Sequence, residues 1–409
     1  MRMRTSAAAA VVAAAALIAT GSLTGTASAA GGGVQATLTP QSVPAGPGRL
    51  FTTTQIDAHV TWAGGLRSQM VGKAQETTPL LLSRDDRNGS GWQEVPLPAY
   101  GGDNEVNSIA TVPGSGGRDT WVVGLADSSQ GDGLPGRGNP GPILAMHWDG
   151  TSWQSLPAPL PADSEFGGFT QVGAVAADDV WAVGWAQVLD SATPNPDKPG
   201  GYIIEDHFEA LAEHWDGHTW TRVAMPDADN FVPNRMAVGP DGDLWAAGYD
   251  GQNDVPVVQH WNGQAWKAET LPATGLAGEI YAIGVDASGT PWAMGRTVLT
   301  ETDTGHALVL RKTGGVWRKV QVPASAGQIQ ALAFTPQGVT VTGNQVGAPD
   351  AYAMAYDGKG WRKLALPKED GTILLSGASY SPGQGLTLVG DVEPTADPLN
   401  PTLLVLSDR

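Results

Sequence analysis

A short motif that ends in glycine recurs along the whole chain and limits the folds that the chain can adopt. Its clearest copy is Asp179–Gly184 (DVWAVG), followed by Glu213–Trp220 (EHWDGHTW). The first half returns at Trp62, Trp121, Trp245 and Trp292, and without the indole at Thr340 and Thr387. These markers lie 47 to 64 residues apart, which is typical of propeller blades with about four strands each. The sequence therefore predicts an all-β, seven-bladed β-propeller with four-stranded blades.

The third repeat shows the four expected strands most clearly. They are Val172–Ala176, Val180–Trp185, Ala210–Trp215 and Thr219–Ala224. Tryptophan recurs at fixed places in the second, third and fourth strands, which suits packing between wedge-shaped sheets. We interpret these indoles as structural and do not expect them to form a ring of ligand-stacking surfaces.

The two ends of the chain are expected to share the last blade. The final repeat supplies only one strand after its marker, Thr402–Leu406, so its fourth strand is missing. Val34–Thr39 has the alternation of that strand, and we expect it to pair beside Thr402–Leu406. This pairing would close the ring and remove unpaired sheet edges.

The first 30 residues have the features of a secretory signal peptide, which leaves residues 31–409 for the propeller. Arg2 and Arg4 precede an apolar, alanine-rich segment, and Ala27–Ala29 has the small-residue form of a cleavage site. The chain has no cysteine, so its stability must come from a large core and not from disulfides. A formal net charge of −18 argues against nucleic acid or a membrane as the main partner. We expect a secreted, extracellular monomer.

The repeat resembles those of kelch and galactose-oxidase-like propellers. It is more similar still to repeats of secreted bacterial proteins with DxWAVG and HWDGxxW units. The resemblance covers the chain from about Phe51 onward and implies an architecture, not an activity. The copper radical chemistry of galactose oxidase needs a cysteine, which this chain lacks. Sialidases have a related Ser-x-Asp-x-Gly-x-x-Trp turn, but Asp149 and Gly150 are adjacent here, so sialidase is only a remote relative.

One candidate binding region comes from long insertions that we expect to be loops on one face of the propeller. Loops on a rigid scaffold often hold functional residues. The insertions are Leu66–Thr78, Ala126–Pro142 and Ala186–Glu209, joined by the blade-to-blade loops Leu160–Phe169 and Asp227–Phe231. The candidate residues there are Trp185, Tyr202, Asp206, His207, Glu209, Asp227 and Asp229. Carboxylates beside aromatic rings suit a carbohydrate, but they suit equally a loop that is ordered by burying its own aromatic side chains.

A second candidate region is a ring of polar residues near the start of the innermost strands. Its members are Asn107, Gln171, Asn234, Glu279 and Gln328. They would line the mouth of the central channel, where propellers often bind ligands. In the competing interpretation their amides satisfy buried backbone groups.

The sequence predicts no metal and no cofactor. His147, His214 and His260 occupy one repeat position on different blades, so they would not converge on one ion. Asp206 and Glu209 would suit a general acid/base pair, but nothing in the sequence fixes their separation. The sequence favours a non-catalytic binding or interaction protein for a glycan or an extracellular protein. The alternative is an exported hydrolase or lyase that acts on polysaccharide.

Overall fold

A computed structural model describes residues 37–71, 74–89, 91–100, 104–126, 141–162, 164–198, 201–300, 302–348 and 350–409. Within these ranges the chain consists of antiparallel β-sheets and one short 3-10 helix, Asp86–Asn88. No helix in the described ranges is long and apolar enough to cross a membrane. The predicted signal peptide lies outside them. The all-β prediction is confirmed.

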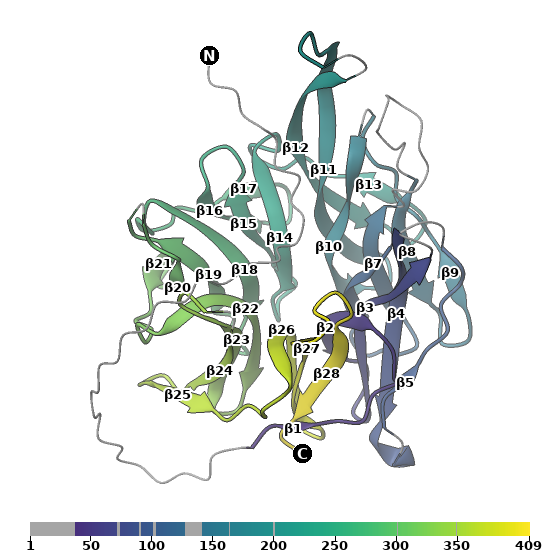
Figure 1. Ribbon diagram of the computed structural model, residues 1–409, viewed down its shortest axis with the longest axis vertical. Coiled ribbons are helices and arrows are strands. Elements are labelled where there is room, and N and C mark those ends of the chain that lie inside the picture. Colours follow the sequence, from purple (N-terminus) through teal and green to yellow (C-terminus); the bar gives the residue numbers. More distant parts are fainter. Residues whose placement is uncertain are drawn as a thin grey trace. The chain divides into compact units, whose positions relative to one another are not determined.

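Most strands form four-stranded sheets that follow chain order (Figure 1). The first contains β2 (Gly48–Gln55), β3 (Val60–Val71), β4 (Ala74–Asp85) and β5 (Gln93–Glu94). Another contains β14 (Phe231–Val238), β15 (Leu244–Asp250), β16 (Val255–Trp261) and β17 (Trp266–Ala268). The next contains β18 (Ala277–Val285), β19 (Pro291–Val298), β20 (His306–Thr313) and β21 (Val316–Lys319). It is followed by β22 (Ala326–Thr335), β23 (Gly338–Gln345), β24 (Ala351–Tyr356) and β25 (Trp361–Leu364).

Two further sets of four strands are joined into one sheet by a pairing of Gly168 with Leu125. One set is β6 (Val106–Thr111), β7 (Thr120–Ala126), β8 (Ile143–Trp148) and β9 (Trp153–Ser155). The other is β10 (Ser164–Ala176), β11 (Asp179–Pro194), β12 (Tyr202–Trp215) and β13 (Trp220–Arg222).

The last sheet combines both ends of the described chain. It contains β26 (Gly371–Ser381), β27 (Gly385–Pro394), β28 (Thr402–Ser407) and β1 (Thr39–Pro40). Thr39 pairs with Ser407, and Pro40 pairs with Leu406. The pairing therefore begins where the expected strand Val34–Thr39 ends, and residues 34–36 lie outside the described ranges.

A bulge in the first strand of every sheet explains the glycine of the repeat. The register between first and second strands slips by one residue, and the residue before the slip pairs with the motif glycine. In the third repeat, Phe169 pairs with Gly184, and a Cβ on Gly184 would overlap the carbonyl oxygen of Gly168. No other residue type fits there without moving a strand. The bulged residues are Phe51, Asn107, Thr170, Asn234, Tyr281, Gln330 and Ser376.

The bulged side chains also tie neighbouring sheets together. Asn107 donates from Nδ2 to the carbonyl oxygen of Phe169 at 3.1 Å. Thr170 donates to Pro233 at 3.0 Å, and Asn234 donates to Ile280 at 2.9 Å. Each acceptor is the residue directly before the next bulge. The first strands contact one another in chain order, and β26 contacts β2.

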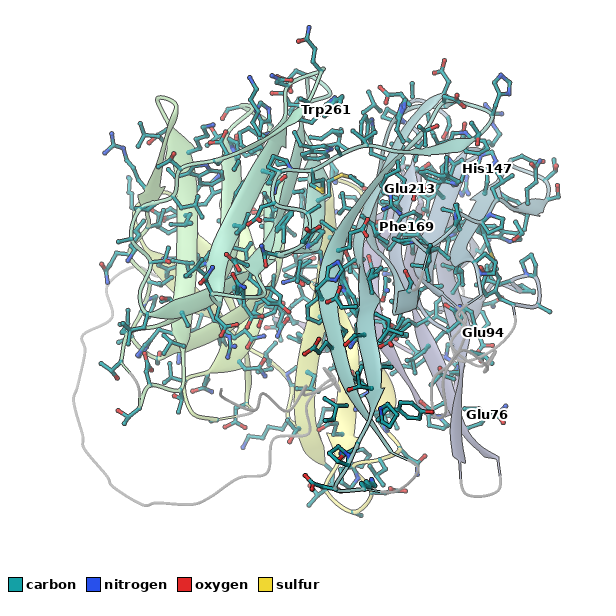
Figure 2. The ribbon with its side chains drawn as sticks, turned by 90° about the horizontal axis from the view of Figure 1, so that it is seen from above. Glu76, Glu94, His147, Phe169, Glu213 and Trp261 are labelled. Atoms are coloured by element: carbon teal, nitrogen blue, oxygen red, sulfur yellow. The ribbon has the colours of Figure 1, made fainter. Side chains whose placement is uncertain are left out.

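Indole rings fill the space between adjacent sheets, as their spacing predicts. The Trp121 ring centroid lies 5.2 Å from that of Trp215 and 5.3 Å from that of Trp220, both in the next set of four strands. The repeat histidine stacks on the same indole and is held by the repeat aspartate. His147, for example, lies 4.7 Å from Trp121 and 2.8 Å from Asp119 Oδ1. Figure 2 shows Phe169 inside the packed sheets and Glu76 at their periphery.

Two of the insertions that we expected to be loops are strands instead. Residues 186–194 and 202–209 belong to β11 and β12, which pair as far as Pro194 with Tyr202. They form a hairpin that projects beyond the neighbouring strands (Figure 1). Leu66–Thr78 likewise belongs largely to the hairpin of β3 and β4. Backbone pairing satisfies donors and acceptors that a loop would leave to water. Most of Ala126–Pro142 lies outside the described residues.

Candidate functional site

The predicted ring of polar residues is largely used by the fold. The amides of Asn107 and Asn234 bind the neighbouring first strands, which agrees with the structural interpretation. Glu279 accepts a hydrogen bond from Arg296 Nη2 at 2.6 Å and another from the Tyr281 hydroxyl. Gln171 and Gln328 are partly exposed, and their side chains have no hydrogen bond to the described part of the chain. The structure thus does not bring the five together as one ligand set.

A partly exposed carboxyl group directly before β6, that of Glu105, predicts a dependence of stability on pH. Burial raises the pKa of Glu105 to about 7, opposed by a hydrogen bond from Asn107. A raised pKa means that the stabilising contribution is complete below the unfolded value of about 4.3 and is lost as the pH rises through 7. We expect Glu105→Gln to match the natural protein at pH 4.5 and to be more stable at pH 8, by up to about 3 kcal/mol.

Urea unfolding at both pH values measures this difference. Glu369→Gln, which changes an exposed carboxylate, should behave like the natural protein throughout. Equal stability of Glu105→Gln and the natural protein at pH 8 would contradict the assignment.

Other side chains of the protein contact several of the predicted site residues in the hairpin of β11 and β12. The ring of Trp185 lies 5.7 Å from Phe166 and 5.4 Å from Phe208, measured between centroids. His207 Nδ1 lies 2.9 Å from Asp190 Oδ1, and Arg222 Nη1 donates to Glu209 at 2.9 Å. Tyr202 is exposed at the end of the hairpin. Trp185, Phe166 and Phe208 therefore pack against one another, whereas Tyr202 does not take part.

The register of this hairpin also separates the proposed acid/base pair. Asp206 lies opposite Leu189, and Glu209 lies opposite Ala186, with no irregularity in β12 between them. Residues three apart in a strand project from opposite faces. Asp206 and Glu209 cannot flank one substrate bond in this arrangement.

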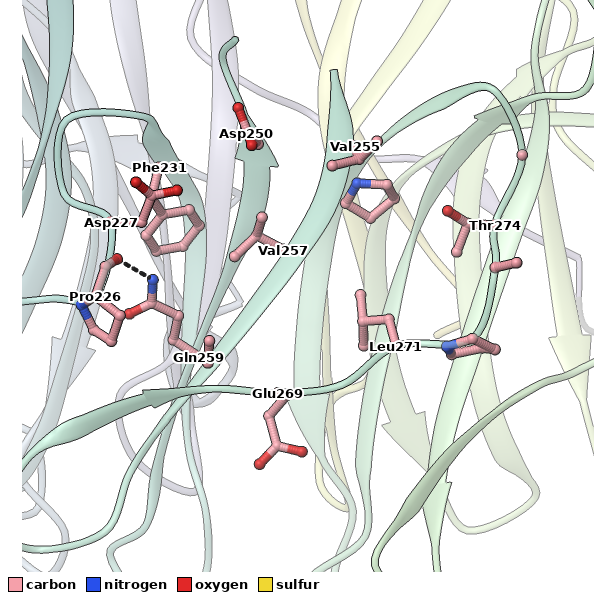
Figure 3. Close-up of a pocket in the computed structure, with 15 residues that line it drawn as sticks. Pro226, Asp227, Phe231, Asp250, Val255, Val257, Gln259, Glu269, Leu271 and Thr274 are labelled. Carbon is pink, nitrogen blue, oxygen red and sulfur yellow. Dashed lines mark hydrogen bonds between the residues drawn. The ribbon is translucent and has the colours of Figure 1, made fainter. Parts of the chain in front are cut away.

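A pocket of about 430 Å³ lies at the sheet of β14 to β17 and includes one of the predicted residues, Asp227 (Figure 3). Its walls come from the turn before β14, from β16, and from the segment Ala268–Gly275 that leads to β18. The turn is closed by amides of Asn230 and Phe231, which donate to the carbonyl oxygen of Asp227. Its position is fixed by the amide of Ala210, which donates to Ala228 at 2.7 Å. Asp229 is exposed in the same turn.

The pocket has an apolar wall with a few polar groups. Phe231, Val257 and Leu271 supply the apolar wall, and only 1% of the Phe231 surface is exposed. Gln259, also 1% exposed, donates from Nε2 to the carbonyl oxygen of Pro226 at 2.8 Å (Figure 3). Its Oε1 atom is buried and has no hydrogen-bond partner in the described structure. A buried acceptor without a donor is costly, and a ligand donor or an ordered water would satisfy it.

The pocket is acidic. Asp227 and Asp250 have no basic residue within ion-pair distance among the described residues. Burial acts to raise the pKa of Asp250, but hydrogen bonds from Asn253 and the amide of Gln252 outweigh it and lower the pKa. Glu269 differs, because it accepts hydrogen bonds from Lys312 Nζ at 2.6 Å and Trp317 Nε1 at 3.0 Å. Two uncompensated carboxylates therefore remain.

Exposed apolar side chains flank the pocket. Val255 belongs to its lining, and Leu276 follows the lining residue Gly275. Leu276 is 60% exposed and Leu299 is 52% exposed. The two lie close together, because the amide of Leu276 donates to the carbonyl oxygen of Val298. Exposed apolar residues around an acidic pocket are typical of a binding surface.

Sequence analysis missed Asp250 and Gln259, although Gln259 had a signal. It precedes the repeat histidine in the third strand, where other repeats have Met146, Leu310 and Met354, although the repeat before it has the buried Glu213. A polar residue in a column of buried apolar ones indicates either a buried hydrogen bond or a ligand contact. Within the described residues, no group of three or more histidine and acidic side chains is arranged to hold a metal ion.

No protein-family model matches the sequence, and no curated protein matches it. Several solved structures are similar in fold. YCF48 bound to a D1 peptide is 17% identical with a TM-score of 0.53, covering 90% of this chain and 94% of that one. YCF48 from Cyanidioschyzon merolae is 13% identical with a TM-score of 0.53, covering 91% and 98%. Hydrazine synthase of Kuenenia stuttgartiensis is 9% identical with a TM-score of 0.50, covering 88% and 95%. These are β-propeller proteins, and the likeness extends to the fold alone.

Proposed function

We propose that the chain is a secreted, extracellular propeller of kelch-like repeats with seven blades. Residues 1–30 form its signal peptide, and residues 31–409 form the propeller. The pairing of β1 with β28 and the contacts of β26 with β2 support a closed ring. Closure explains why the last sheet takes a strand from the start of the chain.

We propose further that the protein is a non-catalytic monomer that binds a basic, partly apolar segment of an extracellular protein in the pocket at β16. The observation on which this depends is the combination of two uncompensated carboxylates, Asp227 and Asp250, with the apolar wall. A lysine or arginine side chain has the matching charge, and its N–H groups are donors of the kind that Gln259 Oε1 lacks. One propeller of similar fold is bound to a peptide, so the fold is compatible with such a partner.

A carbohydrate fits this pocket less well. Sugar rings stack on exposed aromatic faces, but Phe231 is buried in the wall. Trp185 is also unsuitable, because the rings of Phe166 and Phe208 already contact it. Asp206 and Glu209 project from opposite faces of β12, so this pair of acids does not support the alternative of a polysaccharide hydrolase or lyase.

We expect the double variant Asp227→Asn/Asp250→Asn to bind basic peptides at least tenfold more weakly than the natural protein. Asparagine keeps the shape of both side chains and tolerates the positive φ of 51° at Asp227, so the loss would report charge. The measurement is binding to an array of ten-residue peptides that alternate leucine or valine with lysine or arginine, beside the same peptides carrying glutamate. Binding of the natural protein should weaken with added salt.

Asp216→Asn is the matched control. Asp216 also accepts hydrogen bonds from two backbone amides of a turn, but it does not line the pocket. A parallel glycan array tests the other ligand class. Binding to glycans without binding to peptides, or equal peptide binding by the double variant, would contradict the proposal.

A further inference from the structure

Arg235 presents most of its hydrogen-bond donors to no acceptor in the protein. It lies in β14 directly after the bulged residue Asn234, and it pairs in register with Ala247. Its Nη1 atom donates to the carbonyl oxygen of Asn234 at 2.9 Å. A guanidinium has five N–H groups, and the other four have no acceptor in the described ranges. The free groups include both on Nη2 and the one on Nε, the edge that binds oxyanions in a bidentate way.

Arg235 has no counter-ion in the described ranges, a feature that it shares with Arg84 and with exposed arginines such as Arg318. The sequence has 41 acidic and 23 basic residues, excluding histidine. Arg49, Arg222 and Arg296 all form ion pairs with carboxylates. No carboxylate in the described ranges lies within ion-pair distance of Arg235, although the side chain is only partly exposed. Loss of water contacts lowers the pKa of its guanidinium. A cation with little solvent and no partner is costly unless something else compensates the charge.

The positions equivalent to Arg235 are polar on the first strands before β14 and small on the first strands after it. The residues directly after each bulge are Thr52, Ser108, Gln171, Arg235, Ala282, Ala331 and Gly377. Ser108 shows that this position faces the next first strand, because its Oγ accepts the amide of Val172 at 3.1 Å. Consecutive first strands thus present hydroxyl, amide and guanidinium groups, whereas the three strands that follow β14 present only small side chains.

We propose that Arg235 is an anion-binding residue that holds a small oxyanion (a carboxylate, sulfate or phosphate group) at the inner edge of the sheets. The anion would accept hydrogen bonds from the free edge of the guanidinium and neutralise its charge. The side chain of Gln171 on the preceding first strand has free donors that could add a contact. This site is separate from the acidic pocket at β16 and does not depend on the function proposed for it.

Thermal unfolding in a Tris chloride buffer, with sodium sulfate, phosphate or acetate exchanged for sodium chloride at constant ionic strength, tests the proposal. For a dissociation constant near 1 mM, 50 mM of the bound anion should raise the melting temperature by about 3 °C. Arg235→Gln should lose this increase. It should also melt at or above the temperature of the natural protein in chloride alone, because the substitution removes an uncompensated charge. The anion that gives the largest difference between the two proteins identifies the class of ligand.

Arg318→Gln is the matched control, since Arg318 is exposed and distant in sequence, and it should respond as the natural protein does. Arg235→Lys keeps the charge without the bidentate edge, and it should respond to the anion by less than half as much. An equal response of Arg235→Gln and the natural protein would reveal a general salt effect and overturn the proposal. No response of the natural protein to any of the three anions would overturn it too.

Discussion

Replacing Gly248 with alanine will lower the free energy of unfolding by about 3 kcal/mol or more, because the new methyl group has no space. Gly248 is the motif glycine of β15, and it pairs with Pro233 directly before the bulge of β14. A Cβ at this position would overlap the carbonyl oxygen of Val232 and crowd the amide of Asn234 at 3.0 Å. Both contacts are with backbone, so relief requires the first strand to move away from the second. Urea unfolding followed by tryptophan fluorescence measures the loss.

Gly360→Ala is the control for this substitution. Gly360 precedes the last strand of its sheet, has no positive φ, and has nothing within 4 Å of an added Cβ. Alanine there should leave the stability within about 0.5 kcal/mol of the natural value. If both variants lose the same amount, steric exclusion at the bulge is not the reason for the repeat glycine.

The sequence alone was enough to identify the repeat, but it did not explain why the repeat ends in glycine. Spacing of Trp121, Trp181 and Trp245 predicted four-stranded units with indoles between them, and this packing is observed. No particular residue type marks the bulge, since Phe51, Asn107 and Ser376 share no chemical property. It became visible only from the register of two paired strands. The conformation of one strand, and not its side chains, imposes the glycine on the other.

The hairpin of β11 and β12 shows why the length of a strand is hard to predict from sequence. Residues 186–194 combine apolar and polar side chains without strict alternation, and pairing with residues 202–209 stabilises them as strand. The better guide was the turn. Glycine and proline gather only at 194–201, which marks the tip of one long hairpin. Once the two strands are paired, Asp206 and Glu209 fall on opposite faces, so the strand assignment separates two acidic residues that the sequence offers as a general acid/base pair.

The pocket at β16 was harder to predict because several segments spread over about 50 residues, from Pro226 to Gly275, form it together. Asp227 was selected from its turn alone, and Asp250 lies at the end of a strand that sequence analysis treated as structural. Only their juxtaposition makes an acidic site, and that depends on the pairing of β14 with β15, in which Phe231 lies opposite Asp250. Gln259 could be noticed from the repeats alone, because its column holds mostly apolar residues and only Glu213 shares its polar character there.

Replacing Arg49 with alanine will destabilise the protein by about 3 kcal/mol or more at pH 8, since it leaves a buried carboxylate without its cation. Arg49 in β2 donates to Asp391 at 3.0 Å and to Glu393 at 2.7 Å, both in β27. Asp391 is 1% exposed, and burial raises its pKa to about 7 despite the attraction of Arg49. A raised pKa makes the protonated form favourable in the folded state at low pH, so the loss should shrink at pH 5, where Asp391 is neutral.

The dependence on pH distinguishes this ion pair from a simple loss of packing. The double variant Arg49→Ala/Asp391→Asn removes both charges, and it should recover most of the stability that Arg49→Ala loses at pH 8. Arg87→Ala breaks an ion pair with Asp85 on the surface and should change little at either pH. Because β2 begins the first sheet and β27 belongs to the last, the pair joins sheets far apart in sequence. A loss that is equal at pH 5 and pH 8, and is not recovered in the double variant, would mean that charge does not stabilise this junction.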